Sequence, residues 1–276
     1  MDERDFHWLI GILEGEATFG AAMPSTPGIP LIRVVMTDQD VVERVGALWA
    51  RAVFPEPPRQ EHYRVPYVTV LKGAPAVTLM KAVRAHMGAS RQTQIDRAIA
   101  SWHGHRARGG SVTPINDIEH GVCTEDCTVM WLAGLLEGEG TFTTTSADGH
   151  VYPVLELKMC DEGVVRRAAT MLGAANIQIR QPKYPWWNVT YVAKISGFAA
   201  ADMMRALREL MGSRRREAID TALRNYRPIQ LRVAPEHCVV EGCDAPHRGR
   251  GLCHKHYMSW SRDVAKGRAP RITPLR

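Results

Sequence analysis

Two pairs of glutamates, each preceded by the same apolar pattern, are the residues of this sequence whose types and spacing suit metal chemistry. Glu14 and Glu16 end the apolar part of WLIGILEGEATFG, and Glu137 and Glu139 end that of WLAGLLEGEGTF, which starts 123 residues later. Carboxylates suit Mg²⁺, which keeps several waters and completes its shell with phosphate oxygens. Such glutamates, brought together, would therefore suit a divalent cation that acts on phosphate groups.

Each glutamate pair ends an expected helix that carries two glycines on one face. Gly11 and Gly15 are four residues apart in the first helix, and Gly134 and Gly138 repeat this spacing in the second. Glycine inside a helix costs roughly 1 kcal/mol relative to alanine, so a compensating gain is required. Small residues four apart let two helix backbones approach closely. We therefore expect the two helices to pack against each other about a pseudo-two-fold axis.

This packing would bring negative charge together. A helix C-terminus carries roughly half a negative charge, which disfavours carboxylates there, and both expected helices end in glutamates. Because a divalent cation would remove the repulsion, the pattern predicts a Mg²⁺ site where the two helix ends meet.

The repetition extends far beyond these helices. VVMTDQDVVERVGALW (34–49) aligns with LKMCDEGVVRRAATML (157–172) at the same offset of 123. Residues 67–99 then align with residues 191–223 at an offset of 124, so a single inserted residue relates the two copies. The chain therefore contains two copies of one structural unit.

The repeats and the composition between them define four segments. The stretch GHRARGGSVTPINDIEHGVCTED is rich in Gly, Pro and polar residues, which is typical of a linker. The copies themselves cover residues 5–103 and 128–226. The predicted domains are a first repeat at 1–104, a linker at 105–127, a second repeat at 128–227 and an extension at 228–276.

Within one copy the hydrophobic pattern predicts the order helix, two strands, helix, two strands, helix, helix. Asp38 is a suitable N-cap for the second helix. The expected elements of the first copy are a motif helix at 9–17, strands near 18–23, 31–36, 59–63 and 66–72, and later helices from Asp38, at 75–87 and at 90–103. The fold class is therefore α+β, with four antiparallel strands in each copy.

Length, hydropathy and charge limit the possible function classes. The 276 residues can form two ordinary domains, and no uncharged apolar run reaches about 18 residues. Because the start MDERDFHW lacks the pattern of a signal peptide, we expect a free-standing, cytoplasmic protein without a membrane segment. Residues 228–276 hold nine Lys/Arg against four Asp/Glu, whereas the first 227 residues are nearly neutral. A basic extension favours a polyanionic partner.

Four soft or borderline metal ligands lie within 19 residues of this extension: Cys238, Cys243, Cys253 and His256. The set predicts a closed, tetrahedral and therefore structural Cys₃His zinc site. Zn²⁺ would contribute to folding, because so short a segment has little apolar mass of its own. His254 is the alternative fourth ligand.

The stretches LIGILEGEA and LAGLLEGEG resemble the nonapeptide motif of the LAGLIDADG homing endonucleases. The two copies resemble the single-chain, two-repeat form of that family, over about residues 5–227. The resemblance implies tandem αββαββα repeats related by a pseudo-two-fold axis, whose two antiparallel four-stranded sheets form a saddle over double-stranded DNA. It implies a monomer that acts on DNA and on no small molecule, here with a small C-terminal zinc module.

The family binds its catalytic metal at the penultimate position of each motif, which corresponds to Glu16 and Glu139 in this sequence. Ala17 and Gly140, at the final motif positions, are assigned to the same Mg²⁺ site, although Ala17 departs from the glycine of the family. The implied activity is Mg²⁺-dependent cleavage of both strands of a long, non-palindromic site, leaving 3′ overhangs. The alternative is a non-cleaving binder on the same fold, either an intron RNA maturase or a DNA-binding regulator.

The family often adds a catalytic lysine from late in the sheet, and Lys72 and Lys194 are the candidates. They do not occupy equivalent repeat positions, and a phosphate contact is the alternative role for each.

Strand alternation places polar side chains on the face opposite the core. Arg, Lys, Asn, Thr and Glu can read base edges in a major groove, and the two copies differ at these positions, so the site can be non-palindromic. For Arg214 and Arg215 the alternatives are a phosphate contact or a helix cap. The predicted DNA-binding residues are Arg33, Arg59, Arg64, Thr141, Thr143, Thr145, Glu156, Lys158, Arg180, Lys183, Asn188, Thr190, Arg214 and Arg215 in the repeats, and Arg248, Arg250, Arg262, Lys266 and Arg268 in the extension.

Overall fold

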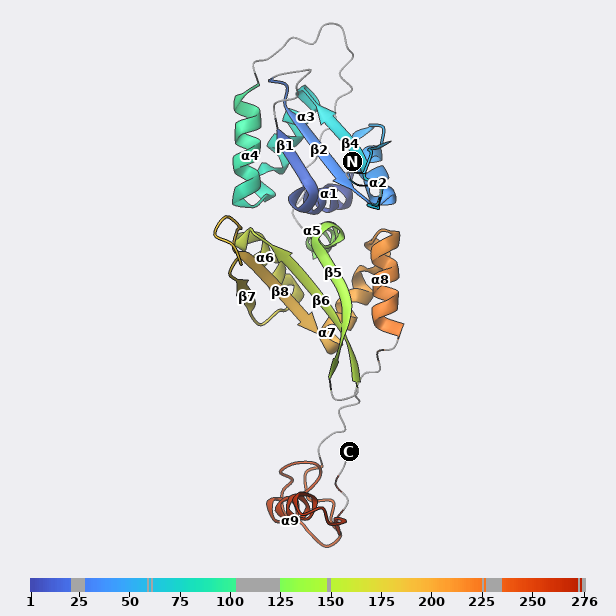
Figure 1. The fold of residues 1–276 in the computed structure, drawn as a ribbon, viewed down its shortest axis with the longest axis vertical. Coiled ribbons are helices and arrows are strands. Elements are labelled where there is room, and N and C mark those ends of the chain that lie inside the picture. The colour runs from blue at the N-terminus through green and yellow to red at the C-terminus, as the bar shows by residue number, and fades with distance from the viewer. Residues whose placement is uncertain are drawn as a thin grey trace. The chain divides into compact units, whose positions relative to one another are not determined.

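The structure of the chain is a computed structural model (Figure 1). It describes residues 1–20, 28–58, 60, 62–102, 125–147, 150–224, 226, 235–272 and 274. The chain divides into two compact units, a repeat unit (Met1–Arg227) and a C-terminal unit (Pro228–Arg276). Each unit has its own cluster of buried apolar side chains.

The repeat unit contains the same succession of elements twice. The first copy consists of α1 (Glu3–Glu16), β1 (Ala17–Gly20), β2 (Leu31–Met36), α2 (Gln39–Trp49), β3 (Phe54–Pro55), β4 (Tyr67–Lys72), α3 (Ala74–Val83), the 3₁₀ turn η1 (Arg84–His86) and α4 (Ala89–Ala100). The second consists of α5 (Glu125–Glu139), β5 (Gly140–Ala147), β6 (His150–Met159), α6 (Glu162–Leu172), β7 (Ile177–Arg180), β8 (Thr190–Ser196), α7 (Gly197–Leu207), η2 (Arg208–Leu210) and α8 (Ser213–Arg224). The predicted α+β repeat is confirmed.

The strands form two four-stranded sheets, ordered β1-β2-β4-β3 and β5-β6-β8-β7, in which all neighbours are antiparallel. Their side chains alternate between two faces. In β2, Ile32 and Val34 are buried in the core, whereas Arg33 and Val35 face the other side and are half-buried. Helices α2 and α3 pack on the first sheet and α6 and α7 on the second. This leaves the opposite face of each sheet as the polar face.

Three local predictions differ from the structure. The third strand is Phe54–Pro55, earlier in the chain than the predicted 59–63, of which residues 59 and 61 lie outside the described part. Phe54 pairs with Val68 of β4, and Pro57 and Pro58, which lack an N–H group, follow it. The motif helix starts at Glu3 and not at Leu9, since Asp2 caps it by accepting a hydrogen bond from the Asp5 N–H at 2.7 Å. Helix α5 starts at Glu125, inside the predicted linker.

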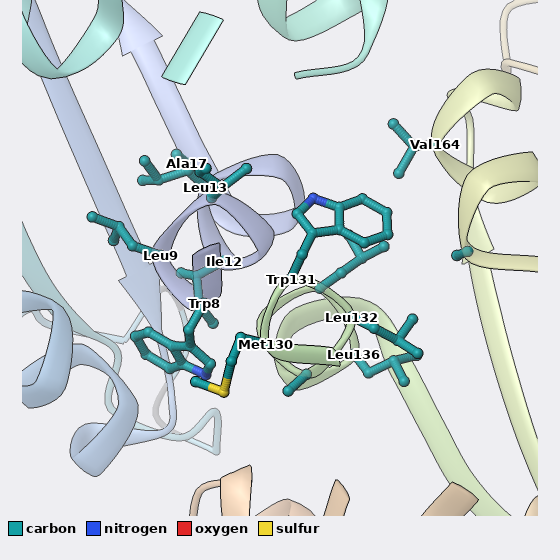
Figure 2. Close-up of a cluster of buried hydrophobic side chains, with 14 of the residues drawn as sticks. Trp8, Leu9, Ile12, Leu13, Ala17, Met130, Trp131, Leu132, Leu136 and Val164 are labelled. Carbon is teal, nitrogen blue, oxygen red and sulfur yellow. The ribbon is translucent and has the colours of Figure 1, made fainter. Parts of the chain in front are cut away.

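Helices α1 and α5 form the centre of the repeat unit and pack side by side between the two sheets (Figure 1). Their tryptophans, Trp8 and Trp131, are both buried and lie on different sides of the helix pair (Figure 2). Where the helices touch, a Cβ added to Gly11 would overlap the carbonyl oxygen of Trp131, and one added to Gly134 would overlap that of Trp8. The predicted contact through glycines is confirmed, and it is a contact of backbone with backbone.

The C-terminal unit is small. Its helix α9 (His254–Ala265) follows a segment that holds two isolated β-bridges, His237 to Pro246 and Gly249 to Leu252. Leu252 is buried with two cysteines, and Tyr257 and Trp260 pack against them. Among the described residues of both units, no helix is long and apolar enough to cross a bilayer.

The glycine contact gives a test of the helix interface. Replacing Gly11 by alanine should lower the free energy of unfolding of the repeat unit by about 2 to 3 kcal/mol, because the added methyl group forces two backbones apart. This loss should exceed the gain of roughly 1 kcal/mol that alanine brings in helix propensity. Urea unfolding followed by far-UV circular dichroism measures the difference.

The matched control is Gly20→Ala in β1, where, among the described residues, an added Cβ meets only Leu31 Cδ1, at 4.0 Å. We expect a change within about 0.5 kcal/mol, as for surface substitutions. Equal stability of both variants would contradict the backbone contact.

Candidate active site and nucleic-acid interface

The C-terminal ends of α1 and α5 bring the two predicted metal-binding glutamates together. Each carboxylate side chain lies across the interface from a glycine of the other helix. A Cβ on Gly138 would lie 3.0 Å from Glu16 Oε1, and a Cβ on Gly15 would lie 3.1 Å from Glu139 Cγ. The motif glycines therefore make room for the carboxylates of the opposite repeat as well as for its backbone.

These two carboxyl groups are hard to ionise in the protein alone. Burial, and after it the nearby charge of Glu139, raise the pKa of Glu16 to about 7. Burial also raises the pKa of Glu139. Both effects penalise the carboxylate form, and a divalent cation would relieve both, because it replaces lost hydration and neutralises the pair. The chemistry of this donor set thus fits a hard cation such as Mg²⁺.

The other two motif glutamates have a different environment. Glu14 and Glu137 are buried, and each accepts a hydrogen bond of 2.7 Å from a backbone N–H, that of Gly88 and that of Gly212 respectively. Burial raises the pKa of each to about 7 despite this bond. Each therefore ties the end of its motif helix to the start of the last helix of its own repeat.

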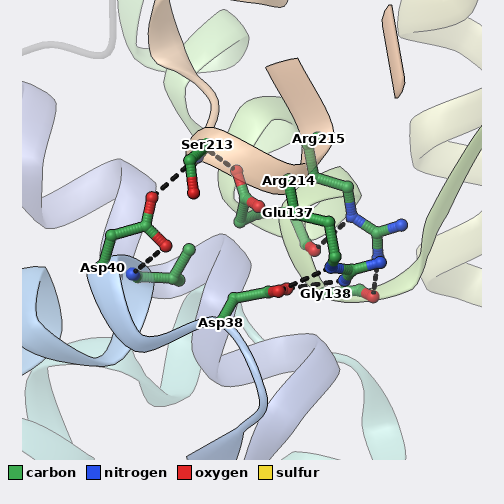
Figure 3. Close-up of polar contacts among 9 residues, drawn as sticks. Asp38, Asp40, Glu137, Gly138, Ser213, Arg214 and Arg215 are labelled. Carbon is green, nitrogen blue, oxygen red and sulfur yellow. Dashed lines mark hydrogen bonds and ion pairs between the residues drawn. The ribbon is translucent and has the colours of Figure 1, made fainter. Parts of the chain in front are cut away.

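Two arginines complete the helix ends. Arg91 donates to the carbonyl oxygens of Glu14 and Gly15 at 2.9 and 2.8 Å. Arg215 donates to the equivalent oxygens of Glu137 and Gly138 at 2.9 and 2.6 Å (Figure 3). The guanidinium groups satisfy carbonyls that a helix end leaves unpaired. Their charges oppose, without cancelling, the rise in the pKa of Glu139 that burial causes.

Of the two predicted alternatives for Arg215, the structure shows the helix cap. Arg91 is absent from the residues predicted above, although the repeat alignment pairs it with Arg215. That alignment is the signal that would have identified it.

Arg214 has a partner in the other repeat. It binds Asp38 through two hydrogen bonds of 2.5 Å, and the Ser213 N–H donates to Asp40 at 2.7 Å (Figure 3). Asp38 occupies the predicted N-cap position of α2 but makes no side-chain capping bond, whereas its equivalent Asp161 caps α6 through the Val164 N–H. The ion pair therefore replaces one cap and links the two repeats.

A cleft of about 810 Å³ extends from the motif glutamates onto the second sheet. Its lining includes Gly15 and Glu139 from the helix ends and Arg91 from α4. From the second sheet and its loop come three of the predicted DNA-binding residues: Lys158, Asn188 and Thr190. Polar groups expected to contact DNA thus share one surface with the candidate metal site.

The other predicted contact residues of the repeat unit lie in varied settings. Thr141, Thr143 and Thr145 are exposed along β5. Arg33 is bound to Glu56, with a nearest distance of 2.5 Å, and Arg180 lies 3.6 Å from Glu156. Arg64 and Lys183 are exposed. Arg59 lies outside the described residues.

The register separates the two candidate catalytic lysines. Lys194 pairs with Glu156, which pairs with Thr141, two residues beyond Glu139. Lys72 pairs with Leu31, which pairs with Gly20, four residues beyond Glu16. Because successive strand residues are about 3.3 Å apart, the backbone of Lys194 is closer along the sheet to Glu139 than that of Lys72 is to Glu16.

Alanine at position 17, where the family motif has glycine, causes no backbone strain. Ala17 is buried, its φ of −79° and ψ of 147° are extended, and its N–H donates to the Leu13 carbonyl. At Gly140, by contrast, an added Cβ would lie 2.5 Å from the Leu136 carbonyl oxygen. The second motif therefore needs its final glycine where the first does not.

In the C-terminal unit, the ligand atoms of Cys238, Cys243, Cys253 and His256 all lie within 4.8 Å of one another. The Sγ atoms of Cys243 and Cys253 are 3.8 Å apart, and Cys253 Sγ lies 3.5 Å from His256 Nδ1. Ligands of a tetrahedral zinc ion would be about 3.8 Å apart for two sulfurs and about 3.5 Å for sulfur and nitrogen. The donor set fits zinc, with His256 and not the exposed His254 as its fourth member.

The thiol of Cys238 is poised for ligation. Although burial raises its pKa, hydrogen bonds from the Cys253 backbone and from His256 lower it to about 6 overall. Arg248, Arg250, Arg262, Lys266 and Arg268 of this unit are exposed.

Solved structures share the fold of the repeat unit. A crystal structure of the LAGLIDADG homing endonuclease I-GzeII in complex with its DNA target matches 78% of this chain and 87% of that chain, with 11% sequence identity and a TM-score of 0.52. The LAGLIDADG meganuclease I-AabMI bound to uncleaved DNA matches 78% and 88%, with 12% identity and a TM-score of 0.51. No protein-family model and no curated protein matches the sequence. The chain has the fold of these LAGLIDADG enzymes, as its motifs imply.

Removing the cap at the end of α5 tests the role of Arg215. We expect Arg215→Ala to lower the free energy of unfolding by about 3 kcal/mol, because two carbonyls lose a charged donor in a half-buried site. Arg166→Ala serves as the control, since the Arg166 side chain is 61% exposed and its ion pair with Glu162 lies along its own helix. Its loss should stay below about 0.5 kcal/mol. Chemical denaturation of both variants would show whether this order holds, and a reversed order would contradict the capping role.

Proposed function

We propose that this chain, which has the fold of the single-chain LAGLIDADG homing endonucleases, is a site-specific endonuclease that cleaves both strands of a long, non-palindromic DNA site. The observation that carries the proposal is the meeting of Glu16 and Glu139 at the ends of α1 and α5, beside a cleft lined by Lys158 and Thr190. A scaffold that only bound nucleic acid would not need two carboxylates with raised pKa values at this point.

Glu16 and Glu139 would hold Mg²⁺, together with the adjoining residues Ala17 and Gly140. When bound, the cation would supply activation of the attacking water and stabilisation of charge on the leaving oxygen. Arg91 and Arg215 fix the helix ends that carry the glutamates. Lys194 is the better placed of the two candidate lysines to stabilise charge on a phosphate.

The polar faces of the two sheets would read the target. Arg33 in the first repeat corresponds to Glu156 in the second, and Lys194 corresponds to Val70. Because these outward side chains differ, the two half-sites can differ in sequence. One chain would suffice for both strands, and the resemblance to the family implies short 3′ overhangs in the product.

The C-terminal unit would bind one zinc ion through its Cys₃His set, and its basic residues would add phosphate contacts. Its buried apolar side chains are few, so metal binding would supply much of its folding free energy. The closed ligand set makes this zinc structural and not catalytic.

Replacing either metal-binding glutamate should abolish cleavage and spare binding. With duplexes selected by the protein from a randomised library, we expect Glu16→Gln and Glu139→Gln to cut at least about 100-fold more slowly in Mg²⁺, because several kcal/mol of transition-state stabilisation are lost. Glu43→Gln, at an exposed glutamate of α2, is the control. Gel analysis of single-turnover reactions measures the rates.

Cleavage by both variants at the parental rate would contradict the assigned metal site. If the parent binds DNA but never cuts it, a maturase or regulator role would replace the proposed one.

Disrupting the zinc site should weaken DNA binding alone. Cys253→Ser in the full-length chain is expected to lose zinc and to bind DNA less tightly. The logarithm of its association constant for DNA should fall less steeply with the logarithm of the salt concentration, because fewer phosphates are neutralised. The cleavage rate at saturating DNA should stay unchanged. Met258→Ser, at an uncharged residue of the same unit that is 46% exposed and outside the ligand set, is the control. Metal analysis and binding titrations at several salt concentrations provide the readouts, and unchanged affinity after zinc loss would leave the unit without a role in binding.

A further inference from the structure

Three aromatic side chains are gathered on the turn between β7 and β8 and are left facing solvent. Trp186 is 74% exposed, more than any other large apolar side chain of the described residues, and Trp187 is 55% exposed. Tyr184 stacks on Trp186 with their ring centroids 5.1 Å apart, and Trp187 meets Tyr184 edge-on at 5.0 Å. We call this cluster, Tyr184–Trp187, the aromatic turn. Apolar surface gathered in this way is typical of an interaction site.

The aromatic turn is held in one shape. The Trp187 N–H donates to the Tyr184 carbonyl at 3.0 Å, and prolines at positions 182 and 185 restrict the backbone. A backbone restrained in this way has less conformational entropy to lose when a partner binds. The aromatic turn therefore presents its rings on a restrained backbone, as a platform.

The charge around the platform favours an anionic partner. Lys183 Nζ lies 5.4 Å from the centre of the Tyr184 ring. Arg180, which lies 3.6 Å from Glu156 and is 47% exposed, ends the preceding strand. Residues 181–189 contain no Asp or Glu. An exposed tryptophan ring beside positive charge matches the two parts of a nucleotide, because bases stack on aromatic rings while phosphates attract cations.

The location joins the platform to the candidate active site. Asn188 and Val189, the next residues along the chain, line the same cleft as Gly15 and Glu139. The turn lies on the side of its sheet that is nearer to α4 (Figure 1), and Ser90 and Arg91 of α4 line that cleft too. DNA in contact with the glutamates would thus pass the aromatic turn close to the scissile bonds.

The described part of the first repeat shows no equivalent platform. Its corresponding connection, between β3 and β4, has His62 and Tyr63 in edge contact, and its sequence contains no tryptophan. Any stacking by the aromatic turn would therefore act on one half of the bound site.

We propose that the aromatic turn is a nucleobase-stacking wedge, in which Trp186 stacks on one base of a partly opened base step beside the cleavage centre, in the half-site bound by the second repeat. This inference rests on the proposed function, since it takes duplex DNA as the ligand. Side chains that enter a base step unstack it and kink the duplex, which lets more of the protein surface make contact.

The test uses the zinc-loaded, full-length chain without added Mg²⁺ and duplexes that it selects from a randomised library. 2-Aminopurine, a fluorescent base sensitive to stacking, is placed at successive positions of the selected site. We expect its fluorescence to change on binding at one or two neighbouring positions of one half-site only. Trp186→Ala should abolish that change and weaken binding about 5- to 150-fold, as expected for the loss of one stacked base, while Trp186→Phe should retain the change.

Phe198→Ala is the matched control, because Phe198 is 66% exposed but lies on α7, outside the turn; it should behave like the parent. Because both side chains are exposed, we expect the variants to melt at the temperature of the parent, and thermal melts check that they fold. Equal affinity and identical fluorescence profiles for the parent and Trp186→Ala would overturn the wedge and leave the proposed function intact. A loss of affinity with no position-specific change would also contradict stacking. A parent that selects no duplex at all would overturn both proposals.

Discussion

At Gly11 and Gly134, helices α1 and α5 touch backbone to backbone, with no room for a Cβ on either side. Strands β1 and β5 begin directly at the ends of these helices, at Ala17 and Gly140. The same contact therefore places both sheets and both glutamates that are proposed to bind metal. Any shift along the helix pair would move the carboxylates apart and change the positions of the two polar sheet faces together.

The helix pair and the repeated elements around it could be predicted from the sequence, because their signals are local and occur twice. Glycines four residues apart and paired glutamates predict the helix contact without knowledge of the fold. The ion pair between Arg214 and Asp38 was not accessible, since its partners are 176 residues apart and Arg214 corresponds to a serine in the first copy. The third strand was misplaced for a related reason. Phe54–Pro55 is held by pairing with β4 and not by an alternating pattern of its own.

Residues that are the same in both repeats have different roles from residues that differ between them. Arg91 and Arg215, like Glu14 and Glu137, make the same contacts in both copies and hold the helix ends. Some of the differences between the copies lie on the polar faces and in the loops, as between the turn bearing Trp186 and its counterpart with Tyr63. Under the proposed function, the shared contacts would hold the metal site while each half adapts to its own DNA sequence.

The most direct test of the central claim is the position of a bound metal ion. Mn²⁺, which accepts the same carboxylate ligands as Mg²⁺, can be located by anomalous diffraction in crystals of the full-length protein with a selected duplex. The account predicts Mn²⁺ coordinated by the carboxylates of both Glu16 and Glu139, next to backbone phosphates of the DNA. Crystals in which neither glutamate coordinates Mn²⁺ while the duplex occupies the polar sheet faces would contradict it.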